Sequence, residues 1–219
     1  MNRRYQIISD LPKSLPMFPL SGALLLPRTD LPLSIFEPRY LEMVEVAMAG
    51  NRLIGIIQPQ ADQSQTKPKL MHIGCAGRIT SYSESEDGRI HVTLTGICRF
   101  VLGREARVET PYRQAAIDFR PFAIDLVSGA GAPSVDRAQV LDAFRQYLEL
   151  NNLTTNWEDV NAVNTEVLVN TLSLLAPYPP RDKQALLEAP DLKTRAEVLV
   201  ALTELALKKS LHGNSTRMQ

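Results

Sequence analysis

This chain of 219 residues has no excess charge of either sign, because Lys and Arg number 24 and Asp and Glu also number 24. Nucleic-acid-binding domains usually carry a basic face, so the balance argues against RNA or DNA and against an anionic membrane surface. No apolar run approaches the ~20 residues of a transmembrane helix, and no apolar signal core follows the N-terminus. We therefore expect a cytoplasmic protein without a membrane segment.

Cysteine and histidine are scarce, at two and three residues. Two cysteines are too few for a disulfide scaffold. We expect Cys75 and Cys98 to be small buried apolar residues of matching strands, with a redox pair as the alternative. His72 and His91 fall on predicted strands, where partial exposure accounts for them. A metal or catalytic pair is the alternative for these histidines, but no third ligand has metal-site spacing, so we predict no metal and no cofactor.

Motifs of nucleotide and hydrolytic chemistry are missing as well. No lysine directly follows a glycine, so the chain contains no phosphate-binding P-loop. It also contains no Gly-x-Ser-x-Gly elbow, no His-Glu-x-x-His pattern and no Cys-x-x-Cys pair. These absences predict a protein that is not an enzyme.

The most informative pattern in the chain runs from Leu15 to Ile57. Its first half contains prolines that fix φ and lack an amide donor, and we expect them at strand ends, strand edges or turns: Pro16, Pro19, Pro27 and Pro32. Pro38 suits the first turn of a helix that Gly50 ends. The run Leu53–Ile57 is apolar throughout, which predicts a strand buried on both faces.

Proline usage divides the chain, because most prolines lie at or before Pro133 and helical periodicity dominates beyond it. We predict an α+β protein in which a β-rich subdomain with one helix covers residues 15–120. A linker over 121–133 and a helical bundle over 134–210 are expected to follow.

Local signals predict further details of both parts. Asp87-Gly88 predicts a hairpin with a type I′ turn, and Gly96 predicts a bulge or bend in the following strand. Ser134 and Asp191 are the expected N-caps of the first and last helices of the bundle. A helix near 162–175 is expected to bury Val163, Val167, Leu168, Leu172 and Leu175.

Short blocks in a fixed order add a family signature to these patterns. They are Phe18-Pro19-Leu20, Pro27, Leu31-Pro32-Leu33, Ile35-Phe36-Glu37-Pro38-Arg39-Tyr40, Gly50-Asn51-Arg52, Ile73-Gly74-Cys75-Ala76-Gly77-Arg78-Ile79, Leu94-Thr95-Gly96-Ile97-Cys98-Arg99-Phe100 and Lys183-Gln184-Ala185-Leu186-Leu187-Glu188. In this order they resemble the N-terminal, substrate-binding domain of Lon proteases, over most of the chain.

The resemblance implies a PUA-like fold for the β-rich part and a non-enzymatic role in holding unfolded or tagged polypeptide. Exposed sheet edges accept extended chains through backbone hydrogen bonds, and apolar grooves add affinity. Full-length Lon proteases also carry an ATPase motor and a Ser–Lys peptidase, which this sequence lacks. We therefore expect a stand-alone copy, with a Lon-type protease as a second candidate partner.

Six residues are candidates for the substrate-binding site: Phe36, Glu37, Arg39, Tyr40, Arg78 and Arg99. Glu37, Arg39 and Tyr40 would give the mouth of a groove a charge pair and an aromatic ledge. The structural alternative is that Glu37 stabilises the helix N-terminus and Tyr40 packs inward. Arg78 and Arg99 would either bind a partner carboxylate or pair with acidic residues of the sheet, namely Glu84, Glu86 or Glu105.

Other functions stay open on the sequence alone. A deep apolar cavity between the two subdomains would favour a small-molecule sensor or regulatory protein. RNA binding would require a clustered basic face, and a hydrolase would require convergent titratable groups in a pocket. Self-association is compatible with all of these functions.

Overall fold

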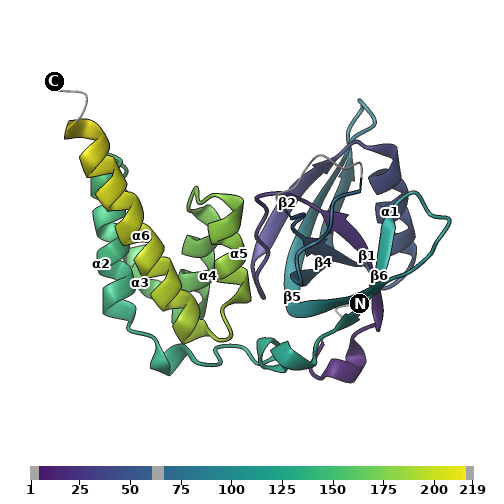
Figure 1. The fold of residues 1–219 in the computed structure, drawn as a ribbon, viewed down its shortest axis with the longest axis horizontal. Coiled ribbons are helices and arrows are strands. Elements are labelled where there is room, and N and C mark those ends of the chain that lie inside the picture. The colour runs from purple at the N-terminus through teal and green to yellow at the C-terminus, as the bar shows by residue number, and fades with distance from the viewer. Residues whose placement is uncertain (1–4, 61–66, 216–219) are drawn as a thin grey trace. The chain divides into compact units, whose positions relative to one another are not determined.

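The computed structural model describes residues 5–60 and 67–215, with side chains up to residue 209. The chain forms two compact units (Figure 1). The first comprises the chain up to Ser128 together with Pro179–Leu187, and the second comprises Gly129–Tyr178 and the chain from Glu188 onward. The polypeptide therefore leaves the first unit, returns to it for one helix, and then completes the second.

The first unit is built on a mixed sheet. Its strands are β1 (Ser14–Pro19), β2 (Asp30–Ile35), β3 (Leu53–Ile57), β4 (Ile73–Glu84), β5 (Ile90–Glu105) and β6 (Arg113–Asp118). Its helices are α1 (Pro38–Ala49) and α5 (Pro180–Glu188), with 3-10 segments η1 (Ile8–Asp10) and η2 (Arg120–Leu126). The strand order is β2-β5-β4-β3-β1-β6, and β6 also pairs with β5, so the sheet closes on itself. This is the α+β arrangement with a β-rich first part that the sequence predicts.

One cluster of the first unit's core is formed by apolar side chains from the strands and η2. Phe100 of β5 is fully buried there, and its ring meets that of Phe119 edge-on at a centroid distance of 6.2 Å. Edge-to-face contact is a favourable geometry for two aromatic rings. The core therefore joins β5 directly to the segment that follows β6.

The pattern from Leu15 to Ile57 is confirmed. α1 begins at Pro38 and Gly50 follows its last residue. β3 is buried at every position, as expected for a strand covered on both faces. Pro32 lies in β2, which pairs with β5 alone among the described strands, so the missing amide donor faces no second strand.

The expected bulge at Gly96 is also confirmed. The register between β4 and β5 shifts there and leaves Ile97 as an extra residue. A Cβ atom at position 96 would lie 2.0 Å from the carbonyl oxygen of Leu26. Only glycine permits this approach of two backbones.

The hairpin between β4 and β5 turns at Asp87-Gly88, but the expected type I′ turn is wrong. That turn needs positive φ at both central residues, and of the two only Gly88 has it, at +76°. The amide of Gly88 donates to the Ser85 carbonyl at 3.0 Å, and the amide of Ser85 donates to the Arg89 carbonyl at 2.9 Å. The Asp87 carboxylate also accepts from the Ser85 hydroxyl at 2.5 Å, which favours this longer loop.

α5 belongs to the first unit, although the predicted boundary assigns its residues to the helical bundle over 134–210. Gln58, which follows β3, donates to the side chain of Gln184 at 3.1 Å and to the Pro180 carbonyl at 3.0 Å. Gln184 in turn donates to the Ile73 carbonyl at 3.1 Å. Both glutamines are buried, so these bonds replace water for groups that would otherwise lack a partner.

The expected linker over 121–133 also differs from the structure. η2 occupies its first part and buries Phe122 and Asp125 against the first unit. The second unit begins at Gly129. A segment with buried side chains is part of the fold rather than a flexible connection.

The second unit is helical (Figure 1). It contains η3 (Ala132–Ser134), α2 (Arg137–Leu150), α3 (Trp157–Ala162), α4 (Thr165–Leu175) and α6 (Leu192–Ser215). The N-cap of α2 is Asp136, whose carboxylate accepts from the Gln139 amide at 3.0 Å, and not Ser134 as predicted. Asp191 accepts from the Thr194 amide at 2.8 Å at the start of α6, as expected.

α4 buries a different face from the one predicted. Leu168 is buried as expected, but Val167 and Leu175 are 37% and 73% exposed. The buried face includes Asn170, which accepts from Arg195 of α6 at 3.0 Å, and Ser173, which donates to the Val169 carbonyl at 2.8 Å. Hydrophobic periodicity gave the wrong face because hydrogen-bonded polar residues occupy part of the interior.

Candidate functional site

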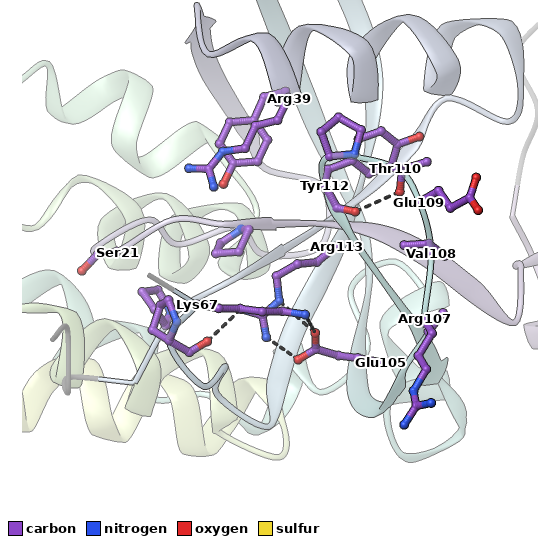
Figure 2. Close-up of a pocket in the computed structure, with 16 residues that line it drawn as sticks. Ser21, Arg39, Lys67, Glu105, Arg107, Val108, Glu109, Thr110, Tyr112 and Arg113 are labelled. Carbon is purple, nitrogen blue, oxygen red and sulfur yellow. Dashed lines mark hydrogen bonds and ion pairs between the residues drawn. The ribbon is translucent and has the colours of Figure 1, made fainter. Parts of the chain in front are cut away.

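An open groove of about 950 Å³ lies on the first unit (Figure 2). One wall is the connection between β5 and β6, and the others are the start of α1, the end of β1 and two short segments around Pro59 and Pro68. Its lining is Pro19, Ser21, Arg39, Tyr40, Pro59, Lys67, Pro68 and Glu105 through Arg113. Its volume exceeds the roughly 330, 230 and 70 Å³ of three other cavities lined by described residues.

A salt bridge holds the two ends of the β5–β6 connection together. The Arg113 guanidinium donates to Glu105 through Nε at 3.0 Å and also through Nη2 (Figure 2). Arg113 Nη1 donates to the Pro68 carbonyl at 2.7 Å, and Lys67 Nζ lies 3.4 Å from Glu105 Oε2. The hydrogen bond from Arg113 lowers the pKa of Glu105. These charge-assisted hydrogen bonds hold the wall formed by the β5–β6 connection in place.

Arg39 and Tyr40 form the side of the groove at the start of α1. Tyr40 is 7% exposed, and its ring lies 4.2 Å from that of Phe18 between centroids. The Arg39 guanidinium lies 4.6 Å from the Tyr40 ring centroid and donates to Glu37 at 2.6 Å. Burial raises the pKa of the Tyr40 phenol. The aromatic ledge is therefore mostly covered, and the exposed part of this side is the arginine.

The β5–β6 connection supplies exposed apolar side chains to the groove. Val108 is 41% exposed at its tip, and Pro111 is exposed beside it. Tyr112 is buried beneath them. Prolines along the groove present rigid apolar surface that loses little entropy on binding. The arrangement offers an apolar strip with guanidinium and carboxylate groups at its edge.

The structure separates the six candidate residues of the sequence. Arg39 and Tyr40 line the groove and Glu37 pairs with Arg39, so this part of the set comes together. Glu37 also stands at the N-cap of α1, but its side chain makes no capping hydrogen bond there. Phe36 is 62% exposed and lies under the Arg89 guanidinium at 5.6 Å, outside the groove lining. Arg78 is half-buried on β4 and is also outside that lining.

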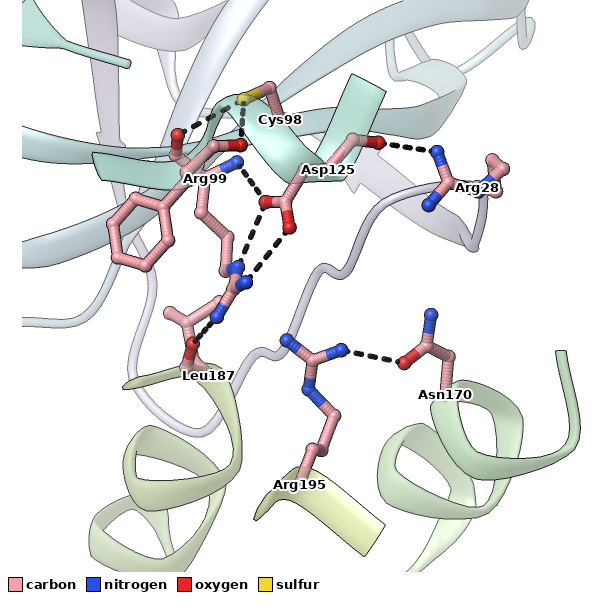
Figure 3. Close-up of polar contacts among 8 residues, drawn as sticks. Arg28, Cys98, Arg99, Asp125, Asn170, Leu187 and Arg195 are labelled. Carbon is pink, nitrogen blue, oxygen red and sulfur yellow. Dashed lines mark hydrogen bonds and ion pairs between the residues drawn. The ribbon is translucent and has the colours of Figure 1, made fainter. Parts of the chain in front are cut away.

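Arg99 is not available to a ligand. Its side chain is 1% exposed and forms an ion pair with Asp125 of η2 at 2.8 Å (Figure 3). Its Nη1 donates to the Leu187 carbonyl of α5 at 3.0 Å. Both expectations for Arg99 are therefore wrong, because its acidic partner comes from η2 and not from the sheet or from a bound chain.

The residues that the sequence did not mark are those of the β5–β6 connection, above all Val108, Tyr112 and Arg113. The sequence signal for them was weak: a valine between two charged residues, followed by a proline shortly before the last predicted strand. Only the closure of the sheet brings this connection beside α1.

Among the described side chains, the two cysteines do not meet, and His72 and His91 lie at different ends of the sheet. Cys98 lies opposite Ala76, the neighbour of Cys75, so the two thiols point to opposite faces of the sheet. His91 lies opposite Ser83 at one end of β4, whereas His72 precedes the other end. Among the described residues, no group of three or more His, Cys, Asp or Glu side chains is arranged to hold a metal ion. None of the described helices is long and apolar enough to cross a membrane.

Comparison with known sequences gives one family over most of the chain. A family model described as the ATP-dependent protease La (LON) substrate-binding domain matches residues 14–204. The Lon protease of Flavobacterium johnsoniae is 29% identical over 215 residues, which cover 93% of this chain and 26% of that protein. The Lon protease of Desulfosudis oleivorans is 30% identical over 109 residues, covering 48% of this chain and 13% of that protein. The chain thus spans about a quarter or less of the length of these relatives.

Two solved structures share the fold. The Lon N-terminal domain protein from Xanthomonas campestris has a TM-score of 0.61 at 21% identity, over 86% of this chain and 97% of that chain. The N-terminal domain of the Mycobacterium avium complex Lon protease has a TM-score of 0.64 at 18% identity, over 88% and 98%. With the family model matched over residues 14–204, the chain belongs to the family of Lon substrate-binding domains.

Proposed function

We propose that this protein is a non-enzymatic polypeptide-binding module and that the groove beside α1 holds an extended, partly apolar segment of unfolded or tagged chain. The observation that carries the proposal is the match to a Lon substrate-binding domain in a chain that has an open, partly apolar groove beside α1. The proposal includes a cytoplasmic location. It also includes a Lon-type protease as second partner, which the Lon proteases among the relatives support.

The groove suits a ligand of loosely defined sequence. Val108 and Pro111 offer apolar contact without a deep side-chain pocket, so many apolar residues would fit. Arg107 and Glu109 flank Val108 and are exposed, which allows polar contacts with the backbone or with side chains of either charge. Such a surface supports binding through shape and burial more than through one specific contact.

The edge of β2 offers a second surface for an extended chain. Among the described strands β2 pairs with β5 alone, so one side of it has no strand partner. An extended peptide adds to such an edge through main-chain hydrogen bonds. Pro32 interrupts the donors of β2, which favours the groove over the edge as the main site.

The proposal is tested with a fluorescent, permanently unfolded polypeptide, a folded control protein and an RNA oligomer. Val108→Glu places a charge on the apolar strip, and Val46→Glu, at an exposed valine of α1 outside the groove lining, is the matched control. We expect saturable binding to the unfolded chain alone, weakened about tenfold by Val108→Glu and little changed by Val46→Glu. Tyr40 is unsuitable for this test because its removal would disturb the core.

Each result of this test has a distinct meaning. No binding of the unfolded chain by the parent protein overturns the proposed function. Binding that both variants weaken equally, or that neither weakens, overturns the assignment to the groove. Preferential binding of the RNA oligomer replaces the polypeptide with nucleic acid as the ligand.

A further inference from the structure

The helical unit contains a pocket of its own, separate from the groove of the first unit. It has a volume of about 230 Å³ and lies between α2, α4 and α6. Val140 and Leu148 of α2 and Leu199 of α6 form part of its buried wall. Leu153 and Leu175 stand at its rim and are 52% and 73% exposed. The pocket therefore opens to solvent through an apolar mouth.

The chemistry of the lining is almost entirely apolar. Among the described residues that line the pocket, none is charged, and the polar side chains are Tyr147, Tyr178 and Thr203. The Thr203 hydroxyl donates to the Leu199 carbonyl at 2.8 Å and lies 2.7 Å from the Tyr178 hydroxyl. Because the hydroxyl proton of Thr203 is engaged, Tyr178 is the donor of that second bond. The lining thus disfavours an ionised group inside the pocket, because its charge would lose its hydration without a partner.

The size of the pocket limits what it can hold. Well-packed interiors leave few voids larger than a water molecule, and each water in the liquid takes up about 30 Å³. A volume near 230 Å³ therefore corresponds to a molecule of roughly eight non-hydrogen atoms. Water in this space would find few hydrogen-bonding partners, so apolar atoms would replace it favourably.

We propose that this pocket binds a small, neutral, largely apolar molecule, such as a short aliphatic alcohol or a single aromatic ring. This inference is independent of polypeptide binding in the first unit. It assigns the second unit the role of a ligand-responsive part of the protein.

The chain contains its own reporter for this site. Trp157 is its single tryptophan, and its ring meets that of Phe144, which lines the pocket, at a centroid distance of 6.0 Å. A ligand that moves Phe144 changes the surroundings of the indole. Tryptophan emission of the full chain therefore follows occupancy without a label.

The test titrates the full chain with benzene, 1-hexanol and hexanoate and follows tryptophan emission and the melting temperature. We expect saturable changes with benzene and 1-hexanol and a rise in melting temperature at saturation. Hexanoate, which has the same chain length as hexanol but carries a charge, is expected to bind at least about tenfold more weakly. Equal binding of hexanoate, or no saturable change with either neutral probe, overturns the proposal.

Substitutions locate the binding. Ala143 is buried on α2 and lines the pocket, so Ala143→Leu fills part of the space. This variant is expected to abolish the change in tryptophan emission on addition of the neutral probes. The control, Ala138→Leu on the exposed side of α2, is expected to leave that change intact. If circular dichroism shows that Ala143→Leu is unfolded, Ala176→Leu fills the pocket from its half-buried rim at the end of α4. Unchanged binding in a folded filling variant overturns the assignment. Saturable binding of an amphipathic helical peptide, with none of the small probes, assigns the pocket to a protein partner instead.

Discussion

Arg99 of β5 and Asp125 of η2 form a two-point ion pair inside the first unit, with Nε–Oδ2 and Nη2–Oδ1 distances of 2.8 Å each (Figure 3). The amide of Arg99 donates to the same carboxylate at 2.9 Å, and the guanidinium lies 4.3 Å from the Phe122 ring centroid. Arg28 donates to the Asp125 carbonyl at 2.5 Å. Since Arg99 also donates to Leu187 of α5, one side chain connects the sheet, η2 and the returning helix.

Replacing Asp125 with Ala leaves the buried guanidinium of Arg99 without its counter-charge. Breaking a buried pair in this way destabilises a protein by about 3–5 kcal/mol, and we expect a loss of that order in urea unfolding. The control is Asp142→Ala, which removes an exposed ion pair with Arg145 and should change stability little. Equal losses for both variants would contradict a structural role for the buried pair.

Gly96→Ala is expected to be one of the most damaging single substitutions in the chain. The new methyl group would lie 2.0 Å from the Leu26 carbonyl oxygen. Only a movement of the backbone could relieve this steric clash. We expect a loss on the order of 4 kcal/mol or more. Gly88→Ala is the control: its φ of +76° is strained for alanine but the space around it is open, so about 1–2 kcal/mol is expected. Chemical denaturation of the two variants compares them, and a Gly96→Ala protein as stable as Gly88→Ala would disprove the backbone contact.

Acid should weaken the first unit partly through Glu105. Arg113 lowers the pKa of this carboxyl below its usual value of 4.5, so the folded state favours the ionised form. That contribution is present above pH 4.5 and is lost as the pH falls through the folded pKa. We expect Glu105→Gln to be less stable than the parent near neutral pH, with a difference that shrinks as the pH falls below 4.5. Urea midpoints measured across pH test this, and a difference independent of pH would contradict it.

Neither cysteine should react in the folded protein. Cys75 and Cys98 are buried, and burial raises the pKa of the Cys98 thiol, which disfavours the reactive thiolate. We expect mass spectrometry to find no alkylation under native conditions and two modified residues in urea. Because the two thiols face opposite sides of the sheet, mild oxidation of the native protein should not join them. An intramolecular disulfide formed without unfolding would contradict the register of β4 and β5.

Local interactions let the sequence determine many elements of this protein. Pro38 begins α1 because its fixed φ suits the first helical turn, and Gly50 follows the last residue of that helix. The apolar run Leu53–Ile57 is β3, and Gly96 is the bulge, because burial and close backbone approach leave direct marks on residue type. The ordered family blocks indicated the Lon substrate-binding domain, which the family match over residues 14–204 confirms.

Long-range contacts could not be predicted from residue types in the same way. Arg99 and Asp125 are 26 residues apart, and nothing in either neighbourhood tells which acid a buried arginine will meet. The return of α5 to the first unit depends on Gln58 and Gln184, which are 126 residues apart and polar, so apolar periodicity could not reveal it. The candidate groove could be predicted only in part for the same reason. The sequence identified Arg39 and Tyr40, whereas Val108 and Arg113 come beside them only when β6 closes the sheet against β5. The sequence determined the elements and the family, and the tertiary structure decided which charges are buried and which surfaces remain open.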